Sequence, residues 1–270
     1  MSLTIILPTL NEFGNISPLI HRLLLVLKDI NNLEILVIDD NSTDGTQEQI
    51  QLLEEVDPRV KLICRDQPNG LTGAIKHGIS LAETDFICWM DSDGSMPADS
   101  LAELWSKKNT GADIIIGSRF VPGGGFKGIT KESRNILSVY RTLKKSNDSV
   151  TAMLLSRVLN KFLRIVLGRD VYDYTSGFLL MRKESIFLED LNGYYGEYFP
   201  VFLYKSLKRG FKILEVPYIN LPRVHGISKT GINTFSLIKT GIPYVTYAVN
   251  VRLKWVYVRF KRECFTSSRS

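Results

Sequence analysis

LEILVIDDNSTDG, residues 33–45, carries the pattern that decides the fold. It begins with a short run rich in Ile, Leu and Val, which is typical of a strand buried on both faces of a parallel sheet. Two carboxylates follow the run, and then come three candidate helix caps, Ser42, Thr43 and Asp44. The stretch therefore predicts one unit of strand, polar turn and helix.

The same unit recurs on both sides of this stretch. Short apolar runs predict strands at residues 3–7, 33–38, 60–64, 86–90 and 114–116. Amphipathic stretches between them predict helices at residues 16–30, 46–55, 74–82 and 100–108. Repeated units of this kind form a doubly wound α/β fold with a mostly parallel sheet, which binds its ligands at the carboxyl ends of the strands.

The second half of the chain has a different pattern. We expect helices at residues 132–167 and 200–208, and strands at 178–181 and 212–218. Residues 235–262 are apolar, aromatic and basic. We therefore expect one α/β domain at residues 1–232, an amphipathic, basic and aromatic membrane-associating segment at 233–265 and a disordered tail at 266–270.

Composition excludes several classes of protein. Three cysteines lie far apart without a Cys-x-x-Cys motif, which argues against a disulfide framework or a zinc site. The net charge of +6 comes from residues 229–270, which hold eight basic residues and one acidic residue. A basic tail needs an anionic partner. We expect a membrane surface in that place, and no nucleic acid.

Carboxylates gather at one edge of the predicted sheet. The residues that follow the first, second and fourth strands are Asn11 and Glu12, Asp39 and Asp40, and Asp91 and Asp93. Like charges at one edge repel each other unless a cation or a polar ligand lies between them. Each motif alone also fits a turn, which is the interpretation we favour for Asp44-Gly45. Together they favour a site for Mg²⁺ or Mn²⁺, because both prefer oxygen ligands.

Seven short motifs occur in a fixed order. They are Pro8-x-x-Asn11-Glu12, Asp39-Asp40-x-Ser42-x-Asp44-Gly45-Thr46, Asn69-Gly70-Leu71, Asp91-x-Asp93, Gly117-Ser118-Arg119, Thr175-Ser176-Gly177-Phe178 and Ser228-Lys229. This order resembles the family 2 glycosyltransferases with the GT-A fold, and within them the dolichyl- and polyprenyl-phosphate sugar synthases. The resemblance implies an inverting enzyme. It would move a hexose such as mannose or glucose from a GDP- or UDP-linked donor to a polyprenyl phosphate, with Mg²⁺ or Mn²⁺ as cofactor.

The resemblance also implies a donor site. Its donor-binding residues would be Pro8, Glu12, Asp39, Asp40, Asp91, Arg223 and Lys229. Asp91 and Asp93 would hold the metal, and Asp93 would also be catalytic. The family often has a Gln two residues after this pair, whereas this chain has Ser95. Coordination would then be weaker, or water would complete it.

For the acceptor phosphate, the resemblance implies contacts from Arg119 and from the motif Arg134-x-x-x-Ser138. Ser156 is the alternative to Ser138, because the chain carries extra residues between the two. A phosphate acceptor is already anionic at neutral pH. It therefore needs arginines that hold it in line with the sugar, and no strong general base.

Two segments indicate attachment to the cytoplasmic face of a membrane. Residues 152–167 carry a basic stripe on an apolar helix, and residues 242–262 mix aromatic with basic side chains. No run reaches the roughly 18 apolar residues of a spanning helix, and residues 1–8 lack the pattern of a secretory signal. A core helix with an oligomer contact is the alternative.

Two other functions stay open at this point. The first is transfer to a saccharide hydroxyl, which needs a carboxylate base. We expect no pair of adjacent carboxylates after Gly117 to supply one. The second is an inactive scaffold that binds nucleotide sugars.

Overall fold

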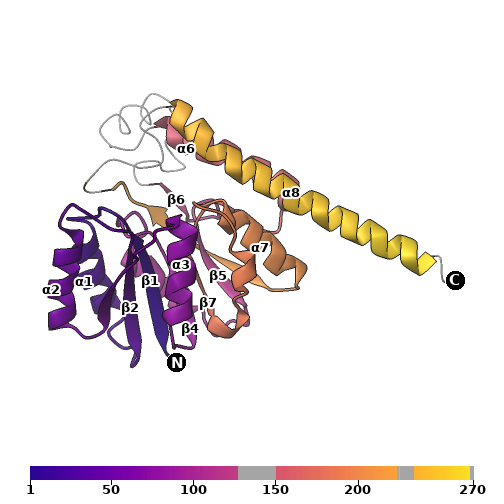
Figure 1. Cartoon of the computed structure of the whole chain (residues 1–270). Helices are drawn as coiled ribbons and strands as arrows, with labels where there is room; N and C mark the ends of the chain where they lie inside the picture. The colour runs from indigo at the N-terminus through magenta and orange to yellow at the C-terminus, as the bar shows by residue number, and fades with distance from the viewer. Residues whose placement is uncertain (127–149, 224, 226–233, 268–270) are drawn as a thin grey trace.

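The computed structural model describes residues 1–126, 150–223, 225 and 234–267. Its centre is a seven-stranded sheet in the order β3-β2-β1-β4-β7-β5-β8 (Figure 1). The strands are β1 (Leu3–Thr9), β2 (Leu33–Asp39), β3 (Val60–Cys64), β4 (Phe86–Trp89), β5 (Ile114–Ser118), β7 (Leu179–Arg182) and β8 (Ile213–Pro217). All neighbours are parallel except β7, which runs antiparallel to both β4 and β5. The expected mostly parallel α/β sheet is confirmed.

Helices cover both faces of this sheet. They are α1 (Ile16–Val26), α2 (Thr46–Val56), α3 (Gly70–Leu81), α4 (Ala98–Ser106), α6 (Val150–Leu167), α7 (Tyr198–Lys208) and α8 (Thr234–Ser267). Alternate residues of β1 serve opposite cores: Ile5 packs with α1 and α4, and Ile6 packs with α3, α6 and α7. Burial on both faces explains why the strands appear in the sequence as continuous apolar runs.

Several short elements lie outside the seven-stranded sheet. β6 (Gly125–Phe126) pairs in parallel with β9 (Ile219–Asn220). Two short 3₁₀ helices, η1 (Lys183–Ser185) and η2 (Leu188–Asp190), connect β7 to α7. α3 begins four residues before the expected helix, at Gly70, whose φ of +81° suits glycine. Of the expected helix at 132–167, the described part is helical from Val150 onward.

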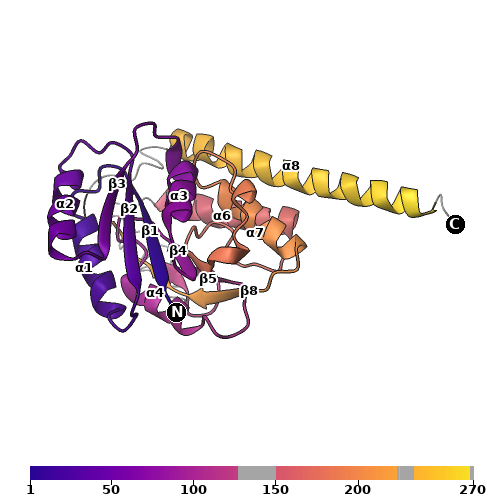
Figure 2. The same ribbon diagram turned by 60° about the horizontal axis from the view of Figure 1, so that its bottom comes forward.

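α8 has 34 residues and crosses the molecule beside α6 and α7. Its first half packs against the body through Tyr244, Ala248 and Val251. Its second half leaves the body and projects outward (Figures 1 and 2). In the part of the chain that the structure describes, no helix combines the length and apolarity needed to cross a membrane.

Candidate active site

A cavity of about 950 Å³ opens at the carboxyl ends of β1, β4 and β5. Its lining joins two kinds of wall. One wall contains the residues that follow the strands, including Pro8, Glu12, Asp91 and Asp93. The other comes from α6 and α8, which lie across the open end of the sheet (Figure 1). The predicted gathering of polar residues at one edge thus agrees with the geometry of the cavity.

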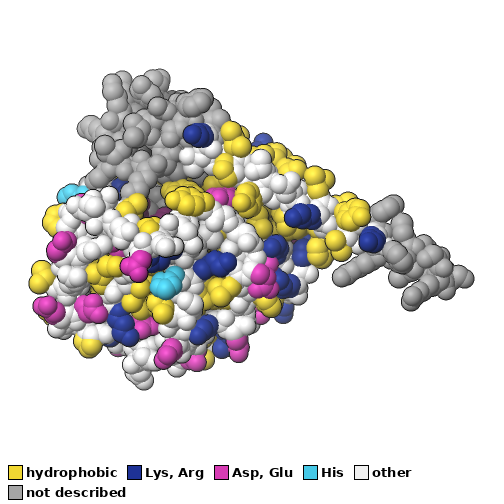
Figure 3. Space-filling view, viewed as in Figure 1, with side chains coloured by type: hydrophobic (Ala, Val, Ile, Leu, Met, Phe, Trp, Pro, Cys, Tyr) yellow, Lys and Arg dark blue, Asp and Glu magenta, His cyan; other side chains and the backbone are white. Residues whose placement is uncertain are grey.

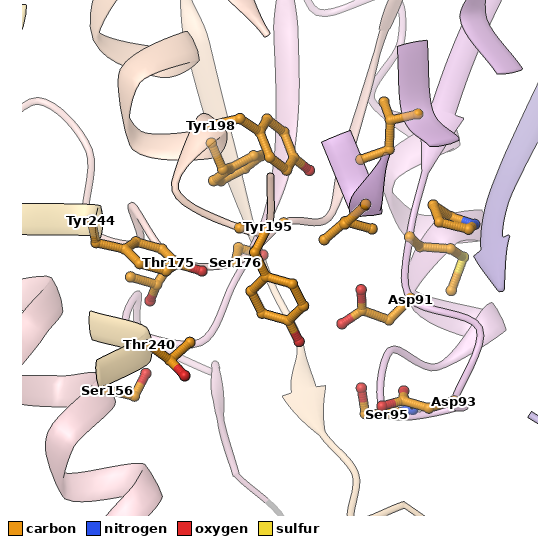
Figure 4. A pocket seen from close by; sticks show the side chains of 18 of the residues that line it. Asp91, Asp93, Ser95, Ser156, Thr175, Ser176, Tyr195, Tyr198, Thr240 and Tyr244 are labelled. Atoms are coloured by element: carbon orange, nitrogen blue, oxygen red, sulfur yellow. The ribbon is translucent and has the colours of Figure 1, made fainter. Parts of the chain in front are cut away.

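Asp91 and Asp93 lie on the loop after β4 (Figure 4). The backbone N–H of Ser95 donates to Asp93 Oδ1 at 2.9 Å, and Arg223 Nη2 donates to Asp93 Oδ2 at 2.6 Å. Burial, and then the charge of Asp93, raises the pKa of Asp91 to about 7. Negative charge at this point is therefore costly, and a cation would offset the cost.

Arg223 connects the ends of two neighbouring strands. Besides Asp93 it donates through Nη1 to Glu12 Oε1 at 3.2 Å. Burial lowers the pKa of Arg223, but Asp93 and Glu12 outweigh this effect and hold it above its ordinary value. The guanidinium is thus a fixed positive charge beside the carboxylate pair.

The chemistry of these residues fits a divalent cation. Among the described residues, no three His, Cys, Asp or Glu side chains are grouped as a complete metal site. Asp91 and Asp93 could supply two hard oxygen ligands to such a cation. Mg²⁺ is often bound in proteins through one or two carboxylates together with phosphate oxygens and water.

The two acidic residues after β2 have different positions. Asp40 lines the cavity and accepts two hydrogen bonds from Arg65, both at 2.6 Å. Asp39 is fully buried and is not among the lining residues; it accepts from the Ser42 backbone at 2.8 Å and from Gln47 at 2.6 Å. Asp40 thus lies at the cavity wall, while Asp39 holds the loop that leads to α2.

Arg119 follows β5 and lines the cavity, as the sequence predicts. It is also ion-paired with Asp173, which is fully buried: Nε donates to Oδ2 and Nη2 donates to Oδ1, both at 2.9 Å. Nη2 also donates to Thr175 Oγ1 at 2.9 Å. Burial lowers the pKa of Arg119, but Asp173 more than compensates and the pKa stays above its ordinary value. The side chain is therefore held rigidly at the cavity wall.

Three predicted residues, Arg134, Ser138 and Lys229, lie outside the described residues. Ser156, the alternative to Ser138, lines the cavity from α6 (Figure 4). The structure thus brings Ser156 into the same cavity as Arg119.

The wall formed by α6 and α8 is mostly apolar. Its apolar lining residues are Leu155, Val158, Leu159, Phe162, Ile242 and Val245. A polar wall that ends in carboxylates and an apolar wall built from two helices suit two different parts of a substrate pair.

Comparison with known proteins agrees with this geometry. The sequence profile described as glycosyl transferase family 2 matches residues 4–187. The chain belongs to glycosyl transferase family 2. Its fold is similar to that of glucosyl-3-phosphoglycerate synthase from Mycobacterium tuberculosis, whose structure was solved with Mn²⁺, UDP-glucose and phosphoglyceric acid. The TM-score is 0.63 at 18% identity, over 93% of this chain and 79% of that one.

Three relatives of this chain have names that describe the transfer of mannose to a polyprenyl-type phosphate. The dolichol-phosphate mannosyltransferase of Pyrococcus furiosus is 32% identical over 85% of this chain and 59% of its own length. The polyprenol monophosphomannose synthase of Mycolicibacterium smegmatis is 31% identical over 83% of this chain and 79% of its own. The undecaprenyl-phosphate mannosyltransferase of Micrococcus luteus is 30% identical over 85% and 87%. The predicted family is confirmed.

Several side chains at the cavity could not be predicted from the sequence. Arg65 and Asp173 occur in segments that resemble ordinary turns, and their partners Asp40 and Arg119 lie 25 and 54 residues away. Tyr195 and Tyr244 line the cavity from segments with no motif around them, apart from the glycines that flank Tyr194-Tyr195.

Proposed function

We propose that this chain transfers a hexose from a nucleoside diphosphate sugar to a polyprenyl phosphate, with inversion at the anomeric carbon. The observation that carries the proposal is the single cavity with two walls. Asp91, Asp93 and Arg223 at the strand ends suit the donor diphosphate, and the apolar wall from α6 and α8 suits an acceptor with a hydrocarbon chain. The names of the three relatives support the same pair of substrates.

Each group of cavity residues would have its own role in the transfer. Asp91 and Asp93 would hold Mg²⁺ or Mn²⁺, which would stabilise the negative charge of the departing nucleoside diphosphate. Arg223 would also stabilise that charge. Arg119, held by Asp173, would fix the acceptor phosphate in line with the anomeric carbon, with Ser156 or Ser138 nearby. Pro8, Glu12 and Asp40 would surround the nucleotide, with Lys229 as a further phosphate contact.

Transfer to a saccharide hydroxyl is less well supported. A pair of adjacent carboxylates does occur after Gly117, at Glu189-Asp190, so that part of the sequence argument is wrong. However, Asp190 is buried and ion-paired with Lys205 at 3.0 Å and with Arg209. Neither Glu189 nor Asp190 lines the cavity. A free base for a sugar hydroxyl would have to come from another residue.

We propose that the exposed surface of α6 and α8 attaches the chain to a membrane, on its cytoplasmic face. α6 exposes Leu154, Val158 and Ile165 on the helix that also carries Arg157 and Lys161. The outer half of α8 exposes apolar and aromatic side chains, namely Leu253, Trp255, Val256, Tyr257 and Val258. Hydrophobic and basic side chains lie together where α8 leaves the body (Figure 3). Such a mixture binds the headgroup region of an anionic bilayer.

The test is an incubation with radiolabelled GDP-mannose, UDP-glucose or UDP-N-acetylglucosamine and an organic lipid extract. We expect label in the organic phase with Mg²⁺ or Mn²⁺, and none after chelation or in the Asp91→Asn variant. Label in water-soluble oligosaccharide would favour the saccharide acceptor instead. No transfer from any donor, with binding retained, would favour the inactive scaffold.

A further inference from the structure

The segment between η2 and α7 brings a tyrosine into the middle of the cavity. This segment, residues 191–197, has the sequence LNGYYGE and is called the Tyr195 loop below. Figure 4 shows the Tyr195 ring between Asp91 and the side of the cavity where Thr175 and Tyr244 lie. Its hydroxyl end points toward the side of Asp91 and Ser95. Tyr195 therefore stands at the boundary between the two walls.

The backbone of the Tyr195 loop is held from inside. Glu197 is buried, and its carboxylate accepts the backbone N–H of Tyr194 at 2.7 Å and that of Tyr195 at 3.1 Å. Gly193 permits this fold, since its φ is +137° and a Cβ there would lie within 3 Å of Glu197. The loop is thus folded over its own carboxylate.

Two helices hold the loop from outside. Thr72 of α3 donates through Oγ1 to the carbonyl of Tyr195 at 3.0 Å. A Cβ on Gly196 would collide with the hydroxyl of Tyr244, so this α8 side chain packs directly on the loop backbone. Contacts from α3 and α8 together restrict the Tyr195 backbone, while Tyr195 itself is 37% exposed and lines the cavity.

The boundary is where the transferred sugar has to lie. A hexose on a donor is attached to the diphosphate at one side and faces the acceptor phosphate at the other. A preorganised aromatic side chain there offers an apolar ring face and one hydroxyl. Polar groups that hydrogen-bond a substrate hydroxyl reject analogues that lack it or place it elsewhere.

We propose that Tyr195 contacts the transferred hexose and determines which hexose the site accepts, with Glu197 as the residue that positions it. The inference rests on the proposed function, because it requires a nucleoside diphosphate sugar as donor. It concerns the sugar alone. In the proposed function, Asp40, Asp91, Asp93 and Arg223 would bind the nucleotide and its phosphates, whereas Tyr195 would contact the sugar.

The test compares donors with and without their sugar. Calorimetric titration in Mg²⁺ would measure the Kd of GDP, GDP-mannose, UDP and UDP-glucose for the wild type and two variants. For the sugar conjugate that binds, we expect Tyr195→Ala to raise the Kd about tenfold, while the Kd of the matching free diphosphate changes less than about twofold. Tyr195→Phe keeps the ring, and loses about threefold to tenfold from the missing hydrogen bond.

Tyr172→Phe is the matched control. Tyr172 is 46% exposed, stacks under Arg164 and does not line the cavity, so all four Kd values should stay at the wild-type level. If Tyr195→Ala raised the Kd of the free and the sugar-linked nucleotide equally, or changed neither, the role of Tyr195 would be overturned and the proposed function would not. A wild-type protein that binds none of the four would overturn the proposed function, and the inference with it.

Discussion

Arg223 Nη2 lies 2.6 Å from Asp93 Oδ2, and Nη1 of the same guanidinium lies 3.2 Å from Glu12 Oε1. The contacts join residues that are 130 and 211 positions apart in the sequence. One arginine thus compensates carboxylates from the ends of two strands before any substrate arrives. A donor diphosphate would find a positive charge already in place, so little reorganisation is needed when it binds.

Arg223→Ala should weaken binding of the donor diphosphate more than Arg223→Lys. Charge-assisted hydrogen bonds are worth about 1.5–3 kcal/mol each, which corresponds to roughly tenfold to hundredfold in Kd. Lysine restores the charge but not the two-pronged contact. Titration of GDP and UDP in Mg²⁺ checks this. An Arg223→Ala variant with wild-type affinity for both nucleotides would contradict the placement of Arg223 at the diphosphate.

Asp91 should make the metal-free protein less stable as the pH rises. Its pKa is about 7 in the folded chain against an ordinary value of 3.8, so folding takes up a proton between these values. The free-energy cost of holding Asp91 ionised in the folded protein is absent below pH 3.8 and fully present above pH 7. Asp91→Asn should therefore gain stability relative to wild type between pH 5 and 8, on the order of 1–3 kcal/mol.

Urea unfolding of both proteins in chelator at pH 5 and pH 8 measures this difference. Saturating Mg²⁺ should stabilise the wild type at pH 8 and reduce the difference, since the cation binds the ionised pair. A difference between the two proteins that is the same at both pH values would show that Asp91 does not titrate in this range.

Arg119 has a structural partner as well as its place at the cavity, which affects the choice of variant. Arg119→Ala would leave Asp173 buried without its cation, which typically costs about 3–5 kcal/mol, so a folding defect would obscure the effect on activity. Arg119→Lys keeps the charge. We expect it to raise KM for polyprenyl phosphate severalfold while the Kd of the donor stays near the wild-type value. A loss confined to donor binding would contradict a role at the acceptor.

The outer half of α8 should be needed for vesicle binding but not for donor binding. Deleting residues 256–270 removes four basic residues and keeps Tyr244, Ala248 and Val251, which pack on the body. Each basic residue near an anionic surface contributes about 1 kcal/mol. Sedimentation with phosphatidylserine vesicles at low salt should show the loss, and donor titration should not.

Transfer assays extend this prediction. The same deletion should reduce transfer to a long-chain lipid phosphate more than transfer to a short, water-soluble analogue. Vesicle binding that survives the deletion would move the attachment to α6. If the wild-type protein does not bind anionic vesicles, the proposed attachment to a membrane is wrong.

The parts of the site that the sequence predicted are those with local causes. Asp91 and Asp93 follow a buried run, and the rule that parallel strands bind ligands at their carboxyl ends predicts the edge of the sheet at which the cavity opens. The direction of β7 could not be predicted, because a strand buried on both faces has the same apolar composition in either direction. The Arg119–Asp173 pair and the Tyr195 loop depend on tertiary contacts between distant segments, and no residue pattern marks such contacts in advance.

The projecting half of α8 has a consequence for its own folding. Residues 252–258 are exposed, and the helix there has few neighbours in the body apart from Arg252 with Tyr204 and Trp255 with Lys208. Turns of helix with so few tertiary contacts open and close locally at little cost in free energy. In water these turns would exchange their amide hydrogens quickly. Binding to a surface that covers these turns would include the free-energy cost of ordering them. Their affinity for that surface is therefore lower than the buried area suggests, and their release from it is correspondingly fast.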